Sequence, residues 1–213
     1  MKKKLILSIL IIFLVLVGLN YLHIKSDEIS LATSSGEARV VLFRKPFSAY
    51  SNRIEIETNG YVYGYVYRKD FKGKNPLNIW KLEVGDVEGD GEMELALGVY
   101  KKSPHHKVLT KRVFLYNIVD GRLKPKFRAS RLSLPMDDFI LYDIDGDGRD
   151  EIVSIEIKDK SYFIAAYHYE NFHLPRDYVS KPLDKKPRFD DGKVMYDGRT
   201  FKLNIREKEI EMK

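Results

Sequence analysis

Residues 82–95 read LEVGDVEGDGEMEL, and residues 139–152 read FILYDIDGDGRDEI. The two stretches align without gaps. In each, an apolar run leads into an acidic loop that contains glycine, and a second apolar run follows. Short apolar runs bounded by glycine and aspartate are typical of β-strands joined by turns. The chain therefore contains a repeated strand–loop–strand unit.

Hairpin signals recur in the rest of the chain. Extended apolar runs flank dipeptides suited to two-residue hairpin turns, whose two positions both need a positive φ. These dipeptides are Asn59-Gly60, Asp120-Gly121 and Asp197-Gly198. We expect an all-β, antiparallel domain over residues 38–213, with repeat units around 79–130 and 136–180. A period of this size is typical of stacked or radially arranged β units such as propeller blades, so we expect a propeller-like repeat domain.

The N-terminus has the pattern of a membrane anchor. Three lysines, residues 2–4, precede an apolar run over residues 5–22. About 17–25 apolar residues span a bilayer as a helix, and flanking lysines stay in the cytoplasm. We expect a cytoplasmic tail (1–4), an uncleaved single-pass transmembrane signal anchor (5–22), a polar linker (23–37) and an extracytoplasmic domain at the cell membrane. A cleaved signal peptide with small residues at 32–34, or a buried core helix, are the alternatives.

The repeated acidic loops predict a metal site. We call residues 86–94 the first loop and residues 143–151 the second loop. In the second loop Asp143, Asp145, Asp147 and Glu151 occupy positions 1, 3, 5 and 9, and glycines at positions 4 and 6 let the backbone curl. Converging carboxylates repel one another, and a hard divalent cation relieves that repulsion. Ca²⁺ tolerates the geometry of a flexible loop, and the backbone carbonyl of Arg149 at position 7 offers a further ligand.

The loops resemble the D-x-D-G-D-G-x-x-[DE] loops of FG-GAP and VCBS-type repeats, which occur in integrin-like β-propellers and in bacterial surface proteins. The resemblance covers residues 80–99 and 139–157. It implies Ca²⁺ ligands at Asp143, Asp145, Asp147 and Glu151, and at Asp86, Glu88, Asp90 and Glu94 in the first loop, where Glu92 is the counterpart of Arg149. Glu88 departs from the aspartate of the pattern and predicts a weaker first site. Residues 79–135 are also similar to an uncharacterised family of bacterial exported proteins. Acidic turns that hold no metal are the alternative reading.

Composition excludes several other classes of protein. The chain has no cysteine, which excludes a disulfide framework, a thiolate zinc site and a lipid-modified cysteine. The net charge is +6, but no nucleic-acid-binding motif is present, so we expect no nucleic-acid partner. We find no G-x-S-x-G elbow, H-E-x-x-H motif or phosphate loop. We therefore expect no enzyme and assign no catalytic and no organic-cofactor residue.

The expected function is a membrane-anchored, Ca²⁺-binding module for interaction or adhesion at the cell envelope. Outside the two loops, lysine and arginine outnumber aspartate and glutamate. Such a basic surface favours an anionic envelope polymer, and another surface protein is a further possible partner. Two alternatives stay open. One is a glycan-active or hydrolytic envelope enzyme with structural calcium, and the other is an accessory subunit of a membrane assembly.

Overall fold

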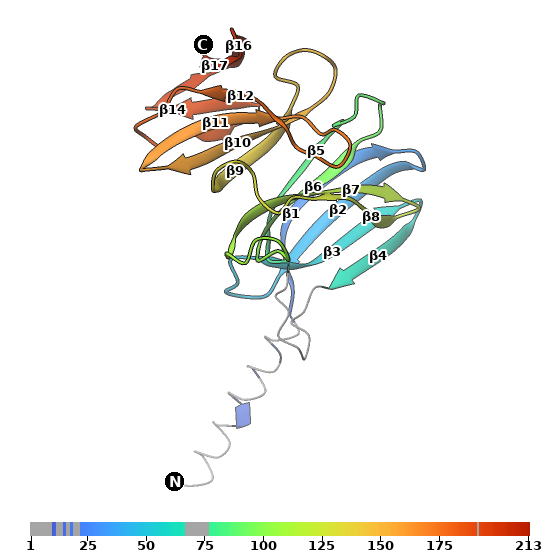
Figure 1. Cartoon of the computed structure of the whole chain (residues 1–213). Helices are drawn as coiled ribbons and strands as arrows, with labels where there is room; N and C mark the ends of the chain where they lie inside the picture. Colours follow the sequence, from blue (N-terminus) through green and yellow to red (C-terminus); the bar gives the residue numbers. More distant parts are fainter. Residues whose placement is uncertain (1–9, 12–14, 16–17, 19–21, 67–76, 191) are drawn as a thin grey trace, which may run out of the picture.

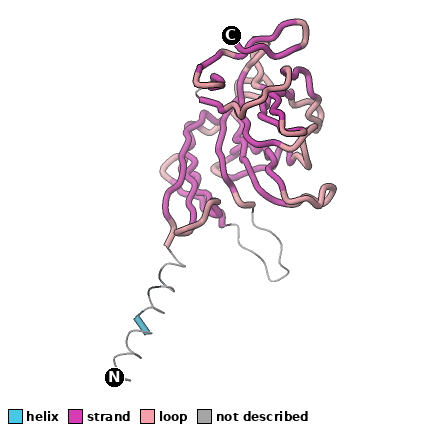
Figure 2. The backbone as a smooth tube through the Cα atoms, turned by 90° about the vertical axis from the view of Figure 1, so that its left-hand side faces the viewer, coloured by secondary structure: helices cyan, strands magenta, loops and turns pink. Residues whose placement is uncertain are grey.

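The structure is a computed structural model that describes residues 10–11, 15, 18, 22–66, 77–190 and 192–213. The elements named in these residues, β1 to β17, are all strands, and strands dominate the backbone trace in Figure 2. Among the strands of the described residues, all pairings but one are antiparallel. The prediction of an antiparallel all-β domain is thus confirmed.

The first four strands form an antiparallel meander, which we call the first meander. Each strand pairs with the next along the chain. The turn between the third and fourth strands contains Asn59 and Gly60 at φ of 50° and 76°, as the hairpin signal predicts. The strands are β1 (Ile24–Thr33), β2 (Gly36–Arg44), β3 (Ser51–Thr58) and β4 (Tyr61–Val66).

The predicted linker over residues 23–37 is wrong. It contains β1 and the start of β2, paired from Ile24 opposite Arg44 to Thr33 opposite Gly36. Leu31 is buried, whereas most of the other side chains of β1 are exposed. The polar composition of this segment therefore belongs to an edge strand that contributes few side chains to a core.

The next two groups of four strands repeat the same arrangement. The second meander contains β5 (Ile79–Gly85), β6 (Glu94–Lys101), β7 (Thr110–Val119) and β8 (Arg122–Arg128). The third contains β9 (Met136–Tyr142), β10 (Glu151–Lys158), β11 (Ser161–Tyr167) and β12 (Arg176–Ser180). The two predicted repeat units therefore correspond to two four-stranded meanders.

The meanders assemble into two large sheets. A bridge between Ser51 and Ile79 joins the first and second meanders into an eight-stranded sheet, in which β8 is an edge strand. The third meander continues through the parallel pair of β12 and β17 (Glu209–Met212) to β16 (Leu203–Arg206). The remaining strands form a three-stranded sheet, which contains β13 (Arg188–Asp190), β14 (Lys193–Tyr196) and β15 (Arg199–Phe201). In Figure 1 the eight-stranded sheet lies below the other two.

In the inner strands, successive side chains point to opposite faces of the sheet, and the side chains on both faces are buried. On β6, Leu95 and Leu97 belong to a first core with the first meander, and Ala96 belongs to a second core with the third meander. On β10, Ile152 lies in the second core and Val153 in a third core against the C-terminal strands. Consecutive meanders are therefore stacked face to face. Within the described residues the sheets stay open and no ring of blades closes.

The predicted membrane anchor, residues 5–22, lies mostly outside the described residues. Residues 10, 11, 15, 18 and 22 are the described members of that run. Within the described part of the chain, no helix has the length and apolar character that crossing a bilayer requires.

Candidate metal centre

The two acidic loops connect equivalent strands and have the same backbone design. In the first loop the carboxylate of Asp86 accepts hydrogen bonds from the N–H groups of Gly89 and Gly91, both at 2.7 Å. In the second loop Asp143 accepts equivalent bonds from Gly146 at 2.7 Å and Gly148 at 3.1 Å. All four glycines have φ between 72° and 89°, a region that L side chains rarely adopt. The sequence repeat is thus a repeat in structure.

The glutamate at position 9 closes each loop from within the fold. Glu94 accepts a hydrogen bond from the N–H of Val87, and Glu151 accepts one from Ile144, both at 3.1 Å. Glu94 is completely buried and Glu151 nearly so. Each loop therefore holds a buried carboxylate that needs a proton or a positive charge nearby.

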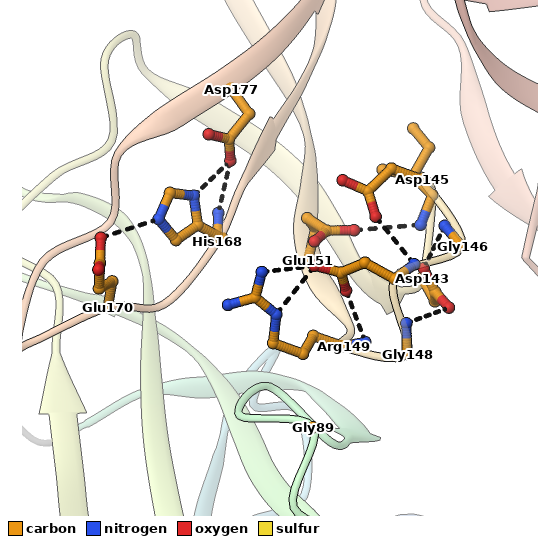
Figure 3. A network of polar contacts seen from close by, with 12 residues as sticks. Gly89, Asp143, Asp145, Gly146, Gly148, Arg149, Glu151, His168, Glu170 and Asp177 are labelled. Atoms are coloured by element: carbon orange, nitrogen blue, oxygen red, sulfur yellow. Dashed lines mark hydrogen bonds and ion pairs between the residues drawn. The ribbon is translucent and has the colours of Figure 1, made fainter.

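Three carboxylates converge in the second loop. Oxygen atoms of Asp143, Asp145 and Glu151 all lie within 4.8 Å of one another (Figure 3). Burial raises the pKa of Glu151 to about 7. The hydrogen bond from Ile144 opposes this shift, and the negative charges of the neighbouring aspartates add to it. This acidic triad, in which Glu151 is buried and Asp145 is exposed, can hold a metal ion.

Two of the predicted ligands in the second loop, Asp145 and Asp147, have side-chain partners within the protein. Asp147 accepts a hydrogen bond from the Arg149 N–H at 2.9 Å and pairs with its guanidinium, with 3.0 Å to Nε. Arg149 lowers the pKa of Asp147 accordingly. Tyr178 on β12 donates its hydroxyl to Asp145 at 3.0 Å. The structure therefore brings together Asp143, Asp145 and Glu151, and places Asp147 against Arg149.

In the first loop a lysine occupies the place of a cation. Lys126 on β8 donates to Glu94 at 2.7 Å and also contacts Glu88. These are positions 9 and 3 of the loop, the counterparts of Glu151 and Asp145. Asn117 adds a hydrogen bond to Glu94 at 3.0 Å. Burial lowers the pKa of Lys126, but its bonds to the two glutamates outweigh burial and raise it. Positions 3 and 9 of the first loop are therefore paired with a lysine of the protein itself.

The remaining predicted ligands of the first loop point elsewhere. Asp90 accepts a hydrogen bond from the N–H of Glu92 at 2.9 Å. Glu92 reaches the turn between β1 and β2, where it accepts a hydrogen bond from the N–H of Ser34 at 3.0 Å. Within the described residues, the acids of the first loop form no convergent group like that of the second.

The two loops lie directly against each other, which the repeat alone does not reveal. Asp150 at position 8 of the second loop accepts a hydrogen bond from the N–H of Asp86 at 2.8 Å and donates its own N–H to the Asp86 carbonyl at 2.7 Å. A Cβ on Gly85 would lie 2.6 Å from the Asp150 carboxylate, and one on Gly89 would lie 2.6 Å from the Arg149 side chain. Glycine at these two positions permits this close approach.

A histidine cluster lies beside the second loop (Figure 3). The Nδ1 atom of His168 lies 2.6 Å from Asp177, and Nε2 lies 3.3 Å from Glu170. Burial lowers the pKa of His168, but the bonds to the two carboxylates outweigh burial and raise it. Sequence reasoning missed this cluster because isolated histidines and acids in separate strands carry no motif. Both ring nitrogens are satisfied, so the cluster fixes the end of β11 to β12.

Comparisons with known proteins support the fold alone. No family model matches the chain, and no curated protein matches it. The fold is similar to the crystal structure of the exotype rhamnogalacturonan lyase YesX, with a TM-score of 0.55 and 13% sequence identity. The match covers 84% of this chain and 39% of the lyase, so this chain spans well under half the length of that enzyme.

Proposed function

We propose that this chain is a membrane-anchored, extracytoplasmic Ca²⁺-binding β-repeat module for interaction at the cell envelope. The convergence of Asp143, Asp145 and Glu151 is the observation that carries the proposal. The expected propeller-like, FG-GAP or VCBS-type character of the repeat belongs to the same proposal, and the stacking of the meanders supports it. The lysine-flanked apolar run supports the anchor.

The chemistry of the triad favours Ca²⁺ over a transition metal. All three side chains offer carboxylate oxygen, which suits hard cations, whereas zinc and copper sites use histidine or cysteine. The triad lies in a curled loop rather than on rigid strands, and Ca²⁺ accepts such irregular geometry. A bound cation would replace the proton that Glu151 otherwise holds near neutral pH. The resulting role is structural, because the loop lies between the second and third meanders.

The module binds through a surface, and we assign it no reaction. The two loops concentrate acidic residues at one place, and the rest of the chain has a basic excess. That excess favours an anionic envelope polymer through long-range attraction. The alternatives of a glycan-active enzyme and of an accessory membrane subunit have no described catalytic group or partner in their favour.

Thermal unfolding tests the proposal directly. Ca²⁺ should raise the melting temperature of the detergent-solubilised chain, because a ligand that binds only the folded state stabilises it. At a hundredfold excess over Kd the gain is about 2.7 kcal/mol, and Kd values near 10⁻⁴–10⁻³ M are typical of extracellular sites. Asp145→Ala should abolish the shift.

Glu88→Ala is the matched control, because Glu88 occupies the same position in the first loop. This variant should keep the full Ca²⁺-dependent shift even if its baseline stability falls. Equal melting temperatures in Ca²⁺ and in chelator would contradict the proposal. If the Ca²⁺-dependent shift were lost in Glu88→Ala and retained in Asp145→Ala, the ion would be bound by the first loop, and the proposal would be wrong.

A further inference from the structure

One end of the eight-stranded sheet lies opposite the acidic loops. The strand ends at this end of the sheet lie opposite one another. Arg44 pairs with Ile24 and with Ser51, and Ser51 also pairs with Ile79. On the far side of the same end, Lys101 pairs with Thr110. Residues 45–50 connect β2 to β3 here, and residues 102–109 connect β6 to β7. We call these two loops together the basic end.

The loop 45–50 is held against the end of β6, the strand from which the loop 102–109 leaves. The rings of Tyr50 and Tyr100 stack with centroids 5.5 Å apart and planes 7° from parallel. Asn78 donates its side-chain amide to the carbonyl of Tyr100 at 3.0 Å. Ser48 hydrogen bonds with the backbone of Tyr50, and Arg44 donates to the Ser48 carbonyl at 3.1 Å. Both loops are drawn at the lower side of the sheet in Figure 1, on the side where β1 begins.

Large apolar side chains point outward from this braced surface. Phe47 is 99% exposed, and Val108 is 58% exposed with Leu109 beside it. Phe47 has φ of 63°, an uncommon conformation for a bulky residue. The backbone thus presents an aromatic ring to the surroundings at the tip of a loop that local hydrogen bonds hold in shape.

The charge of the basic end has one sign. Its two loops contain Lys45, Lys102 and Lys107 with two histidines, and they contain no aspartate or glutamate. The first loop lies at the other ends of the same strands, since β5 runs from Ile79 to it and β6 returns from it, and the second loop lies against the first. The domain is therefore strongly polarised along its strands.

We propose that the basic end docks on an anionic lipid surface, with Phe47 and Val108 in the interfacial layer and the lysines against the headgroups. The inference rests on the proposed membrane anchor, because β1 begins at this end and residues 1–23 join the domain there. Exposed aromatic and apolar side chains enter the interfacial layer of a bilayer, and lysines near an anionic surface are attracted to its headgroups. The combination of exposed apolar tips, two loops whose charged residues are all basic, and the start of β1 at this end favours a bilayer over a protein partner. The acidic loops would then face away from the membrane.

Site-directed spin labels can test this orientation, because the chain has no native cysteine. Single variants Phe47→Cys, Val108→Cys and Phe172→Cys would be labelled in the full chain and reconstituted into vesicles that contain anionic lipid. Phe172 is the matched control, since it is 71% exposed, has the same φ of 63° and follows β11 beside the second loop. Labels at 47 and 108 should be relaxed more by oxygen than by a water-soluble nickel complex, and the label at 172 should show the reverse.

Reversing the charge of lysines in the basic end provides a second test of the docking. Lys102→Glu combined with Lys107→Glu should remove the oxygen preference at residue 47, and vesicles of neutral lipid should do the same. Lys181→Glu with Lys185→Glu, two exposed lysines that follow the third meander, should leave the preference unchanged.

Each contrary result has a distinct meaning. Water-exposed labels at 47 and 108 on protein that floats with the vesicles would overturn the docking while leaving the anchor intact. Failure to float would overturn both. Dipolar broadening between labels at residue 47 of different copies would show that a second copy covers this end, which also overturns lipid docking.

Discussion

Lys126 and the second-loop triad show two ways of compensating the same carboxylates. The lysine side chain is 9% exposed, and it pairs with Glu94, which is completely buried. Its ammonium group stands where a loop of this design offers its oxygens to a cation. The second loop has a tyrosine hydroxyl at Asp145 and no described basic side chain at Glu151. The two copies therefore differ in their need for an ion, although their backbones are alike.

Replacing Lys126 should make the first loop dependent on metal. Lys126→Met leaves Glu88 and Glu94 uncompensated, and loss of one partner of a buried pair costs about 3–5 kcal/mol. We expect this loss in chelator from urea unfolding, and a larger Ca²⁺-dependent gain than in the wild type. Lys124→Met, at an exposed position of the same strand, should change stability by no more than about 0.5 kcal/mol. Equal Ca²⁺ responses in Lys126→Met and the wild type would contradict the exchange of lysine for metal.

The His168 cluster predicts a pH dependence of stability. The pKa of folded His168 lies above its usual value of about 6.5, so the folded state binds the proton more tightly than the unfolded state does. Its contribution is fully present below about pH 6.5 and is lost as the pH rises through the folded pKa. The free energy of unfolding, measured by urea between pH 5.5 and 8.5, should fall over this range more in the wild type than in His168→Gln.

His105→Gln is the control for that measurement, because His105 lies exposed in the loop 102–109. It should keep the wild-type profile. A constant offset between wild type and His168→Gln at all pH values would show that the cluster contributes packing alone.

At the scale of elements, Asp150 joins the acidic loops of two meanders. Its carboxylate accepts from the backbone of Asp86, which lies 64 residues earlier in the chain. Burial raises the pKa of Asp150, and backbone hydrogen bonds from Asp86 and Asp143 oppose this. A single side chain thereby links the turn of one meander to the turn of the next.

Removing that carboxylate should weaken the contact between the loops. Asp150→Ala leaves the Asp86 N–H without its acceptor, at a cost of about 1–3 kcal/mol. Hydrogen exchange at the Asp86 amide should accelerate, and the free energy of unfolding should fall. Asp150→Asn retains an acceptor oxygen and should lose less. Unchanged exchange at Asp86 in Asp150→Ala would show that the loops are held by other contacts.

The features that the sequence predicted correctly depend on residues that are close together in the chain. The strand pairs around the repeat and the turns at Asp120-Gly121 and Asp197-Gly198 depend on a few adjacent residues, and the structure has them. Residues 24–33 form a strand because they pair with β2, and their polar composition therefore led to the wrong prediction of a linker. Lys126 reaches Glu94 across 32 residues, and no motif near either residue records that contact. The convergent acidic triad lies in a loop that the sequence singled out, and Glu88 already predicted a weaker first site, but the lysine that pairs with Glu88 and Glu94 could not be predicted.

At the scale of the whole molecule, the stacked meanders depend on shared cores. Phe139 is completely buried in the second core, where its ring meets Trp80 edge to face at 5.8 Å. Trp80 belongs to the second meander and Phe139 to the third. The stability of either meander is therefore inseparable from its neighbour, as in other stacked repeats.

Phe139→Ala should destabilise the entire domain. Truncating a buried phenylalanine costs about 3–5 kcal/mol through lost burial and the cavity left behind. Fluorescence of Trp80 and far-ultraviolet circular dichroism should report one transition at the same lower urea concentration. Phe172→Ala, at an exposed turn, is the control and should have little effect. Separate transitions by the two probes would contradict the cooperative stacking.

The edge position of β8 also bears on solubility. An edge strand offers unpaired N–H and C=O groups to any passing strand, and exposed edges are common routes to aggregation. Pro125 removes one donor from this edge, and Arg122, Lys124 and Arg128 place exposed positive charges along it. A second chain that tried to extend the sheet here would meet a missing hydrogen bond and like charge. The residues of β8 thus disfavour further strand pairing, and neighbouring copies are kept from joining edge to edge.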